Sequence, residues 1–197
     1  NNTLGYDNIT VRNCEFKETT GHYRDTIYFI NSSNPVIINN TFRLYSGYGV
    51  RLEGSHNANI TNNSFPESTF FSAIYLLESD NATIQDNNIT SLGYRNWEYE
   101  AVLIQDSRYA KLYNNTFTAD YYGSVHVDST TSEMVHFNHT IGEDNTLNGK
   151  SIKYYWNISN TVYQDLDWRG YEVIVAGINN VTFTNLTIYR LFFSDEW

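Results

Sequence analysis

The chain has 197 residues, of which 41% are apolar and 17% charged, and its formal net charge is −10. This length predicts one domain with enough apolar residues for a core, and the acidic balance argues against nucleic acid and against anionic membrane surfaces, which require Lys and Arg. The sequence contains no run of about 20 apolar residues, so no segment is predicted to span a membrane.

The chain holds a single cysteine, Cys14, and an intrachain disulfide is therefore impossible. We expect Cys14 to be a small buried residue, with an intermolecular bridge as the alternative. The sequence begins without Met and without a signal peptide. These features predict a processed or truncated piece of a longer precursor.

A six-residue phrase recurs along the chain: an apolar residue, any residue, Asn, often a second Asn, any residue, and a large apolar residue. The clearest copies are Ile37–Phe42, Ile60–Phe65 and Leu112–Phe117. The weaker copies are Val11–Phe16, Ile84–Ile89, His136–Ile141 and Phe183–Ile188. The third positions are Asn13, Asn39, Asn62, Asp86, Asn114, Asn138 and Asn185.

The spacing of these copies is typical of a solenoid. The first five steps between third positions are 26, 23, 24, 28 and 24 residues, and the last is 47, close to two ordinary steps. A second series stands three residues before each phrase. It comprises Asn8, Asn34, Asn57, Asn81 and Asn180, with Tyr109 and Glu133 as exceptions.

A second short strand follows each phrase. Its copies are Ile27–Ile30, Val50–Leu52, Ile74–Leu76, Val102–Ile104, Val125–Val127 and Val173–Val175. Because side chains alternate across a strand, Tyr28, Arg51, Tyr75, Leu103, His126 and Ile174 are predicted to point outward. A column of hydroxyls just after these strands indicates a turn: Ser32, Ser55, Ser79, Ser107 and Thr130.

These elements predict an all-β protein, a right-handed parallel β-helix of about seven or eight coils with a period of about 24 residues. Residues 1–197 form one solenoid domain, with an irregular coil or hairpin insertion at 142–170. We expect the seven third-position residues to form a buried structural ladder and the sixth-position residues to form an internal stack. Variable loops rich in Tyr and Gly interrupt the pattern at 44–49, 91–100 and 119–123.

The chain resembles the NosD-like right-handed β-helix proteins of the pectin-lyase-like superfamily, whose repeats are common on archaeal and bacterial cell surfaces. The Asn repeats carry this resemblance, together with Asn145–Ile152, Tyr154–Trp156, Val173–Val175 and Asn179–Thr182. The resemblance covers nearly the whole chain and implies the fold. The group includes polysaccharide lyases, uronan epimerases, copper-delivery accessories and structural surface proteins, so several functions stay open.

Acidic residues gather after the second strand and are the catalytic candidates. They are Glu53, Glu78, Asp106 and Asp128, in two registers, with His126 and Arg51 on the outward face of the same strands. A lyase or epimerase would use such groups as base and charge neutraliser, and Ca²⁺ carboxylates often accompany them. The alternative is a solvated rim of acids at a turn, and we predict no catalytic residue and no cofactor.

Copper delivery would require clustered Met and His. The chain has one Met, Met134, and among its five His residues only His136 and His139 are close in sequence. Strand side chains three residues apart face opposite sides, so we expect His136 to stack inside the coils and predict no metal site.

Asn-x-Ser/Thr sequons are frequent, and they are glycosylation acceptors in exported chains. Sequons in the third-position column, at Asn39, Asn62, Asn114, Asn138 and Asn185, are predicted to be buried, where no glycan fits. The predicted glycosylation sites are therefore Asn31, Asn59, Asn88 and Asn157, followed by Asn8, Asn81 and Asn180.

The sequence favours an extracellular or cell-surface structural protein that self-associates into a layer, sheath or filament and carries N-glycans. The Tyr-rich loops could form subunit contacts or stack on sugars. A polysaccharide-binding lyase or epimerase is the alternative, and a copper-delivery accessory is the third hypothesis.

Overall fold

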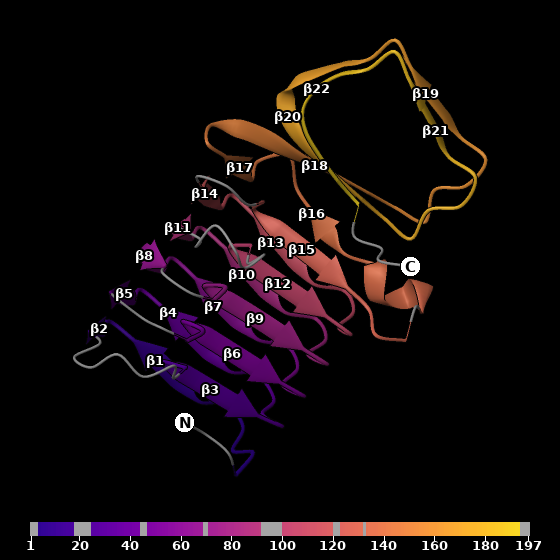
Figure 1. Cartoon of the computed structure of the whole chain (residues 1–197). Helices are drawn as coiled ribbons and strands as arrows, with labels where there is room; N and C mark the ends of the chain where they lie inside the picture. Colours follow the sequence, from indigo (N-terminus) through magenta and orange to yellow (C-terminus); the bar gives the residue numbers. More distant parts are fainter. Residues whose placement is uncertain are drawn as a thin grey trace.

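The computed structural model describes residues 4–17, 25–43, 47–68, 71–91, 100–119, 123–131 and 133–193. Most residues of the three Tyr-rich loops lie outside these ranges. Nearly all regular structure is β-strand, and the described helix is the short 3-10 helix η1 (Met134–Phe137). Successive coils stack along one axis (Figure 1), which confirms the predicted right-handed parallel β-helix, with about six turns of about 24 residues in the main stack.

Each coil contributes strands to three parallel sheets. Sheet 1 holds β3 (Ile27–Ile30), β6 (Val50–Glu53), β9 (Ile74–Leu77), β12 (Val102–Gln105) and β15 (Val125–Asp128). Sheet 2 holds β1 (Thr10–Arg12), β4 (Val36–Ile38), β7 (Asn59–Thr61), β10 (Thr83–Gln85), β13 (Lys111–Tyr113) and β16 (Thr140–Ile141). Sheet 3 begins with β2 (Glu15–Lys17), β5 (Thr41–Arg43), β8 (Ser64–Ser68), β11 (Asn88–Ser91) and β14 (Thr116–Ala119).

A ladder of buried asparagines runs through the coils at the fourth position of the phrase. Its members, between 0% and 1% exposed, are Asn40, Asn63, Asn87, Asn115 and Asn145. The Asn63 amide shows the repeated pattern: its Nδ2 donates to Asn87 Oδ1 at 3.1 Å and to Ile37 O at 2.8 Å. The Asn63 backbone N–H also donates to Asn87 Oδ1, at 2.9 Å. Each amide therefore connects three successive coils.

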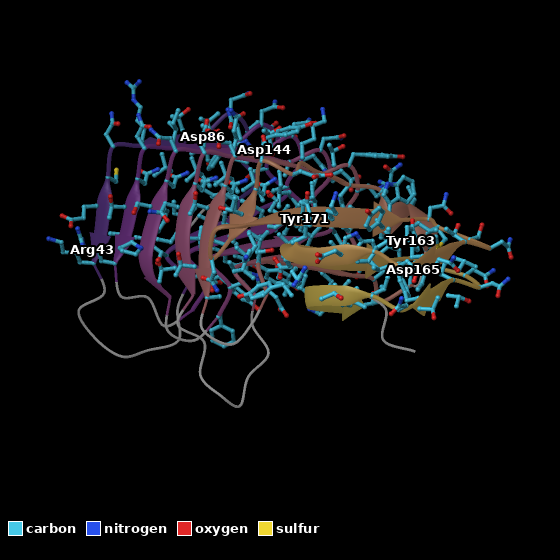
Figure 2. The ribbon with its side chains drawn as sticks, turned by 90° about the horizontal axis from the view of Figure 1, so that it is seen from above. Arg43, Asp86, Asp144, Tyr163, Asp165 and Tyr171 are labelled. Carbon is cyan, nitrogen blue, oxygen red and sulfur yellow. The ribbon has the colours of Figure 1, made fainter. Side chains whose placement is uncertain are left out.

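The third-position residues are not the buried ladder, and that prediction was wrong. Asn13, Asn39, Asn62, Asn114 and Asn185 are exposed, and Asp86 is half-buried. These six residues have φ between 48° and 55°, the left-handed turn conformation that Asn and Asp adopt more readily than most residues. The turn directs their side chains to solvent and places the next residue inside. Asp86 lies on this outer edge in Figure 2.

Residues with left-handed backbone conformation form the turns between the strands of the coils. The described non-glycine residues with positive φ are all Asn or Asp except Glu78 and Tyr109. They include most of the second series, such as Asn8, Asn34, Asn57 and Asn81. The asparagine-rich composition thus follows from the number of sharp turns per coil.

The sixth coil departs from the predicted register. The phrase predicted at His136–Ile141 is wrong, because η1 occupies its start and Asn138 follows the helix with a φ of −80°. Ile141 pairs with Leu112 in sheet 2, and Leu147 pairs with Phe117 in sheet 3. The true phrase therefore contains one additional residue, which hid it from the six-residue pattern.

Two further columns fill the interior. Ser32, Ser55, Ser79 and Ser107 are buried, and each backbone N–H donates to the next serine Oγ, at 3.0 Å, 3.0 Å and 2.8 Å along the column. Thr130 is exposed and stands outside this ladder. The sixth-position rings stack as predicted, with Phe42 and Phe65 centroids 4.5 Å apart. Cys14 occupies the fourth position of the outermost described coil and is exposed, so its predicted burial was wrong.

The chain reverses direction after the sixth coil. β17 (Thr146–Leu147) pairs with β14 in parallel but with β18 (Lys150–Trp156) antiparallel. Two coils with a 20-residue step follow, holding β19 (Val162–Gln164), β20 (Asp167–Ala176), β21 (Thr182–Thr184) and β22 (Thr187–Phe193). These coils form the ring beside the main stack in Figure 1, and Tyr163 and Asp165 lie in them in Figure 2.

The two parts are joined by a buried polar contact. Glu172 of β20 is fully buried, and its Oε1 accepts the Ser124 backbone N–H at 3.1 Å. The Ser124 hydroxyl donates to the other carboxylate oxygen. These bonds fix the second section to the start of β15, because a buried carboxylate is tolerated only where it is hydrogen-bonded.

Replacing a ladder amide is expected to cost far more than replacing its exposed neighbour. Asn115→Ala removes the amide and leaves buried groups of the adjoining coils unpaired, which should lower the free energy of unfolding by about 3 kcal/mol or more. Asn114→Gly keeps the left-handed turn and should cost less than about 1 kcal/mol. Urea unfolding followed by circular dichroism measures both, and equal losses would contradict the assignment of the ladder.

Tyr109 is an exposed residue at which a substitution should stabilise the protein. It holds φ at 59° in the turn column where the preceding coils have Asn. Tyr109→Asn should raise the free energy of unfolding by about 1 kcal/mol, because Asn tolerates the left-handed region. Tyr109→Ala is the control, since alanine removes the ring but keeps the backbone strain, and a matching gain there would argue against strain as the cause.

Candidate functional site

The outward face of sheet 1 gathers most of the residues that the sequence singled out. The row Tyr28, Arg51, Tyr75, Leu103 and His126 lies in register on β3, β6, β9, β12 and β15. Glu53 and Asp128 share a register two residues later, at the ends of β6 and β15. Glu78 and Asp106 stand one residue later, in left-handed turns. The two predicted registers are therefore observed.

Arg51 is the centre of an aromatic and acidic cluster at one end of this face. Its guanidinium lies 4.7 Å from the Tyr28 ring centroid and 5.7 Å from that of Tyr75. Its Nη2 donates to Glu53 Oε2 at 2.9 Å, and Nη1 lies 3.7 Å from Asp25. Tyr48 contributes a third ring, at 5.9 Å. The cation is thus enclosed by rings and paired with two carboxylates.

Glu53 also accepts a hydrogen bond from the Tyr28 hydroxyl at 2.6 Å. Burial raises the pKa of Tyr28, and the bond to the Glu53 carboxylate raises it further. Tyr28 therefore stays protonated, as a hydrogen-bond donor, through the physiological pH range. Glu53 has its carboxylate committed to Tyr28 and Arg51, which suits a structural contact better than a general base.

The other end of the face carries a chain of polar side chains between coils. The Tyr75 hydroxyl donates to Gln105 Oε1, and Gln105 Nε2 donates to Asp128 Oδ2 at 2.9 Å. Asp128 Oδ1 accepts the Ser129 backbone N–H at 2.7 Å. His126 pairs instead with Glu100, at 3.3 Å between Nδ1 and Oε2. Asp128 and His126 therefore have different partners.

Asp106 caps the next turn. Its Oδ1 accepts the Thr130 N–H at 2.8 Å, and its Oδ2 accepts the Thr130 hydroxyl at 2.7 Å. His136 Nδ1 lies 3.6 Å from Asp106 Oδ1 and 2.8 Å from Ser129 Oγ. Ser129 and Asp106 thus approach the same ring nitrogen of His136. A nucleophile relay requires them on opposite nitrogens, so this is not the geometry of a Ser-His-Asp triad.

The five catalytic candidates are consequently spread over separate contacts. Glu53 belongs to the Arg51 cluster, and Asp128 accepts a hydrogen bond from Gln105. His126 pairs with Glu100, and Asp106 caps a turn beside His136. Glu78 is exposed in a left-handed turn. Sequence reasoning missed Asp25, Tyr48 and Glu100, because they stand in or beside variable loops where no register fixes their place. Gln105 could have been found, since it shares the register of Glu53 and Asp128.

The chain matches the family model described as "Periplasmic copper-binding protein (NosD)" over residues 3–167. The chain belongs to the NosD family. The family's description places its members in the periplasm, which agrees with the predicted extracellular or surface location. Within the described residues no helix is long and apolar enough to cross a membrane. No curated protein and no solved structure matches the chain significantly.

The residues that the structure describes do not fit the copper of the family name. Across the described ranges, no three His, Cys, Asp or Glu side chains gather as a metal site requires. His139 is buried and both ring nitrogens are bonded: Nδ1 accepts the Ala110 N–H at 3.1 Å, and Nε2 lies 2.7 Å from His136 O. Met134 is turned toward Gly177. His136 is half-buried on η1 rather than stacked in a coil.

Acid is expected to destabilise the fold through His139, whose pKa burial lowers to about 4 from 6.5. The folded state prefers neutral imidazole, so this contribution is complete above pH 6.5 and is lost as pH falls toward 4, by roughly 1.4 kcal/mol per unit and up to about 3 kcal/mol in total. His139→Asn keeps an acceptor for the Ala110 N–H without titrating.

The difference in stability between wild type and His139→Asn reports the contribution of the His139 imidazole. Urea midpoints of wild type and His139→Asn should diverge between pH 7 and pH 4.5, with wild type losing more stability. Parallel losses in both would show that other groups carry the acid sensitivity.

Proposed function

We propose that this NosD-family chain is a non-catalytic structural β-solenoid of the cell surface or periplasm that self-associates into a layer, sheath or filament. The observation that carries the non-catalytic part is the use of the candidate catalytic side chains as inter-coil contacts. Glu53, Asp106 and Asp128 all bond to groups of their own or adjoining coils. Such contacts add stability and rigidity to a repeat array, which a scaffold requires.

In the isolated chain of residues 1–197, the first described coil is the candidate surface for self-association. β1, β2 and β3 are the terminal strands of sheets 2, 3 and 1. In general, the terminal strand of a sheet can pair with a strand of another chain. Leu4 and Tyr6 beside them are 77% and 63% exposed, whereas the core residues of inner coils are at or near 0%. A second copy stacking here would bury both the apolar side chains and the edge.

A polysaccharide-binding face is the second candidate function, favoured by the three tyrosine rings around Arg51. Tyrosine rings stack on sugar faces, and Arg51 would have to exchange its partners Glu53 and Asp25 for the carboxylates of an acidic polysaccharide. The same face holds the groups that a lyase or epimerase would use. Copper delivery, the third hypothesis, has no set of described residues to hold the metal.

Self-association is tested by negative-stain electron microscopy and sedimentation velocity of the folded chain without denaturant. We expect regular filaments or sheets that shift toward monomers in Thr10→Lys, because a lysine on an edge strand opposes pairing. Thr116→Lys is the control, since Thr116 is exposed on β14 within the stack. Dispersed particles of wild type at all concentrations would refute self-association.

If particles are dispersed, binding to acidic polysaccharides distinguishes the second candidate. Retardation of wild type in a polysaccharide-containing gel, lost in Arg51→Met, would support the Arg51 cluster as a binding site. Cleavage products that disappear in Asp106→Ala would identify an enzyme.

A further inference from the structure

The sequons of the repeat phrase are in register with the solvent side of the solenoid. In the phrase the third and fifth residues face outward, while the fourth and sixth face the core. Asn114 and Thr116 are both exposed, on either side of the fully buried Asn115. Asn39 and Asn62 are likewise exposed, with half-buried hydroxyl residues at the fifth position. Amide and hydroxyl of each sequon therefore share one accessible face.

The buried ladder asparagines, in contrast, are not sequons. Two residues after Asn40, Asn63 and Asn115 stand the core residues Phe42, Phe65 and Phe117. The inward position that hides the amide also requires an apolar side chain two residues later, because side chains alternate along the strand. Burial and the sequon pattern are thus mutually exclusive in this repeat.

The backbone conformation distinguishes two groups among the described sequons, and Asn138, with a φ of −80° after η1, belongs to neither. Those in left-handed turns have φ between 48° and 59°: Asn8, Asn31, Asn39, Asn62, Asn81, Asn114, Asn157, Asn180 and Asn185. Asn59 and Asn88 lie instead within β7 and β11, flanked by paired strands on both sides. Because a glycan is bulky, asparagines that accept one lie at the surface on turns and loops rather than within packed sheets.

Contacts between coils leave the turn amides chemically available. Asn62 Nδ2 donates to Asn39 Oδ1 at 2.6 Å, and Asn114 Nδ2 donates to Asp86 Oδ1 at 2.6 Å. A primary amide carries two hydrogens, so one such bond uses half of the donor capacity. The bond fixes the orientation of the amide plane and still permits substitution of the second hydrogen.

From this register we infer that the glycan acceptors of the chain are the asparagines of the left-handed turns, foremost Asn39, Asn62 and Asn114. Their Nδ2 would attack the anomeric carbon of a lipid-linked oligosaccharide phosphate or pyrophosphate. The new C–N bond replaces one N–H, whose proton is released, and the lipid phosphate or pyrophosphate leaves with the electron pair of the broken C–O bond. This inference rests on export of the chain and does not depend on self-association.

The acceptors form a line along the solenoid rather than a scattered set. All three stand at the turn between sheets 2 and 3, the edge on which Asp86 lies in Figure 2. Neighbouring coils are about 4.8 Å apart, so glycans on Asn39 and Asn62 compete for the same space.

Site-resolved mass spectrometry tests the inference on the full chain, exported through a host membrane that carries an N-glycosylation system. We expect glycopeptides at Asn114 in wild type and in Thr116→Ser, and their loss in Thr116→Ala, which removes the sequon at an exposed position. Asn39 and Asn62 should be modified on different molecules, and Asn59 and Asn88 should stay unmodified. Circular dichroism confirms that the three proteins are equally folded.

Two results would overturn the inference. One is modification of Asn59 or Asn88 with Asn39, Asn62 and Asn114 unmodified. The other is a complete lack of glycan while a control glycoprotein from the same host is modified. Sedimentation of the same samples reports self-association separately, so failure of one proposal is distinguishable from failure of the other.

Discussion

The buried asparagine ladder is the interaction on which the rest of the structure depends. A parallel solenoid must turn sharply several times per coil, and each turn removes backbone groups from the sheets. Buried groups of this kind are costly unless they are bonded. The ladder amides supply the missing partners: Asn87 Nδ2 donates to Asn115 Oδ1 at 3.0 Å and to Ile60 O at 2.9 Å. The same bonds fix the coil-to-coil register, which aligns every other column.

The turns explain why asparagine serves two opposite roles in adjacent positions. At the third position the backbone requires a residue that accepts positive φ, and the side chain is exposed. At the fourth position the same side chain is buried and bonded on all sides. One residue type satisfies both needs, the first by its tolerance of the left-handed region and the second by its paired donor and acceptor. The exposed third-position amides are therefore accessible to modifying enzymes, whereas the buried fourth-position amides are fully used in hydrogen bonds between coils.

On the outward face of sheet 1, charged residues likewise form contacts that hold the coils together. Glu53 accepts hydrogen bonds from Arg51 and Tyr28, and Asp106 caps a turn. These acidic residues therefore bond to groups within the stack of coils. Membership of the NosD family establishes the architecture and the location but not a copper site in the described residues. In a solenoid most repeated residues hold the coils together, so the fold alone does not specify a function.

The sequence by itself determined the β-helix, its period and the internal aromatic stack, because periodic apolar and turn residues report local geometry directly. It did not determine which of two adjacent asparagines lies inside. The local pattern of Asn39 and Asn40 is nearly symmetric, and only stacking against the next coil shows that the third position takes the left-handed turn. The register of the sixth coil and the bond between Glu172 and Ser124 also required the tertiary structure. Both depend on contacts between residues about 30 to 50 positions apart, which no local pattern encodes.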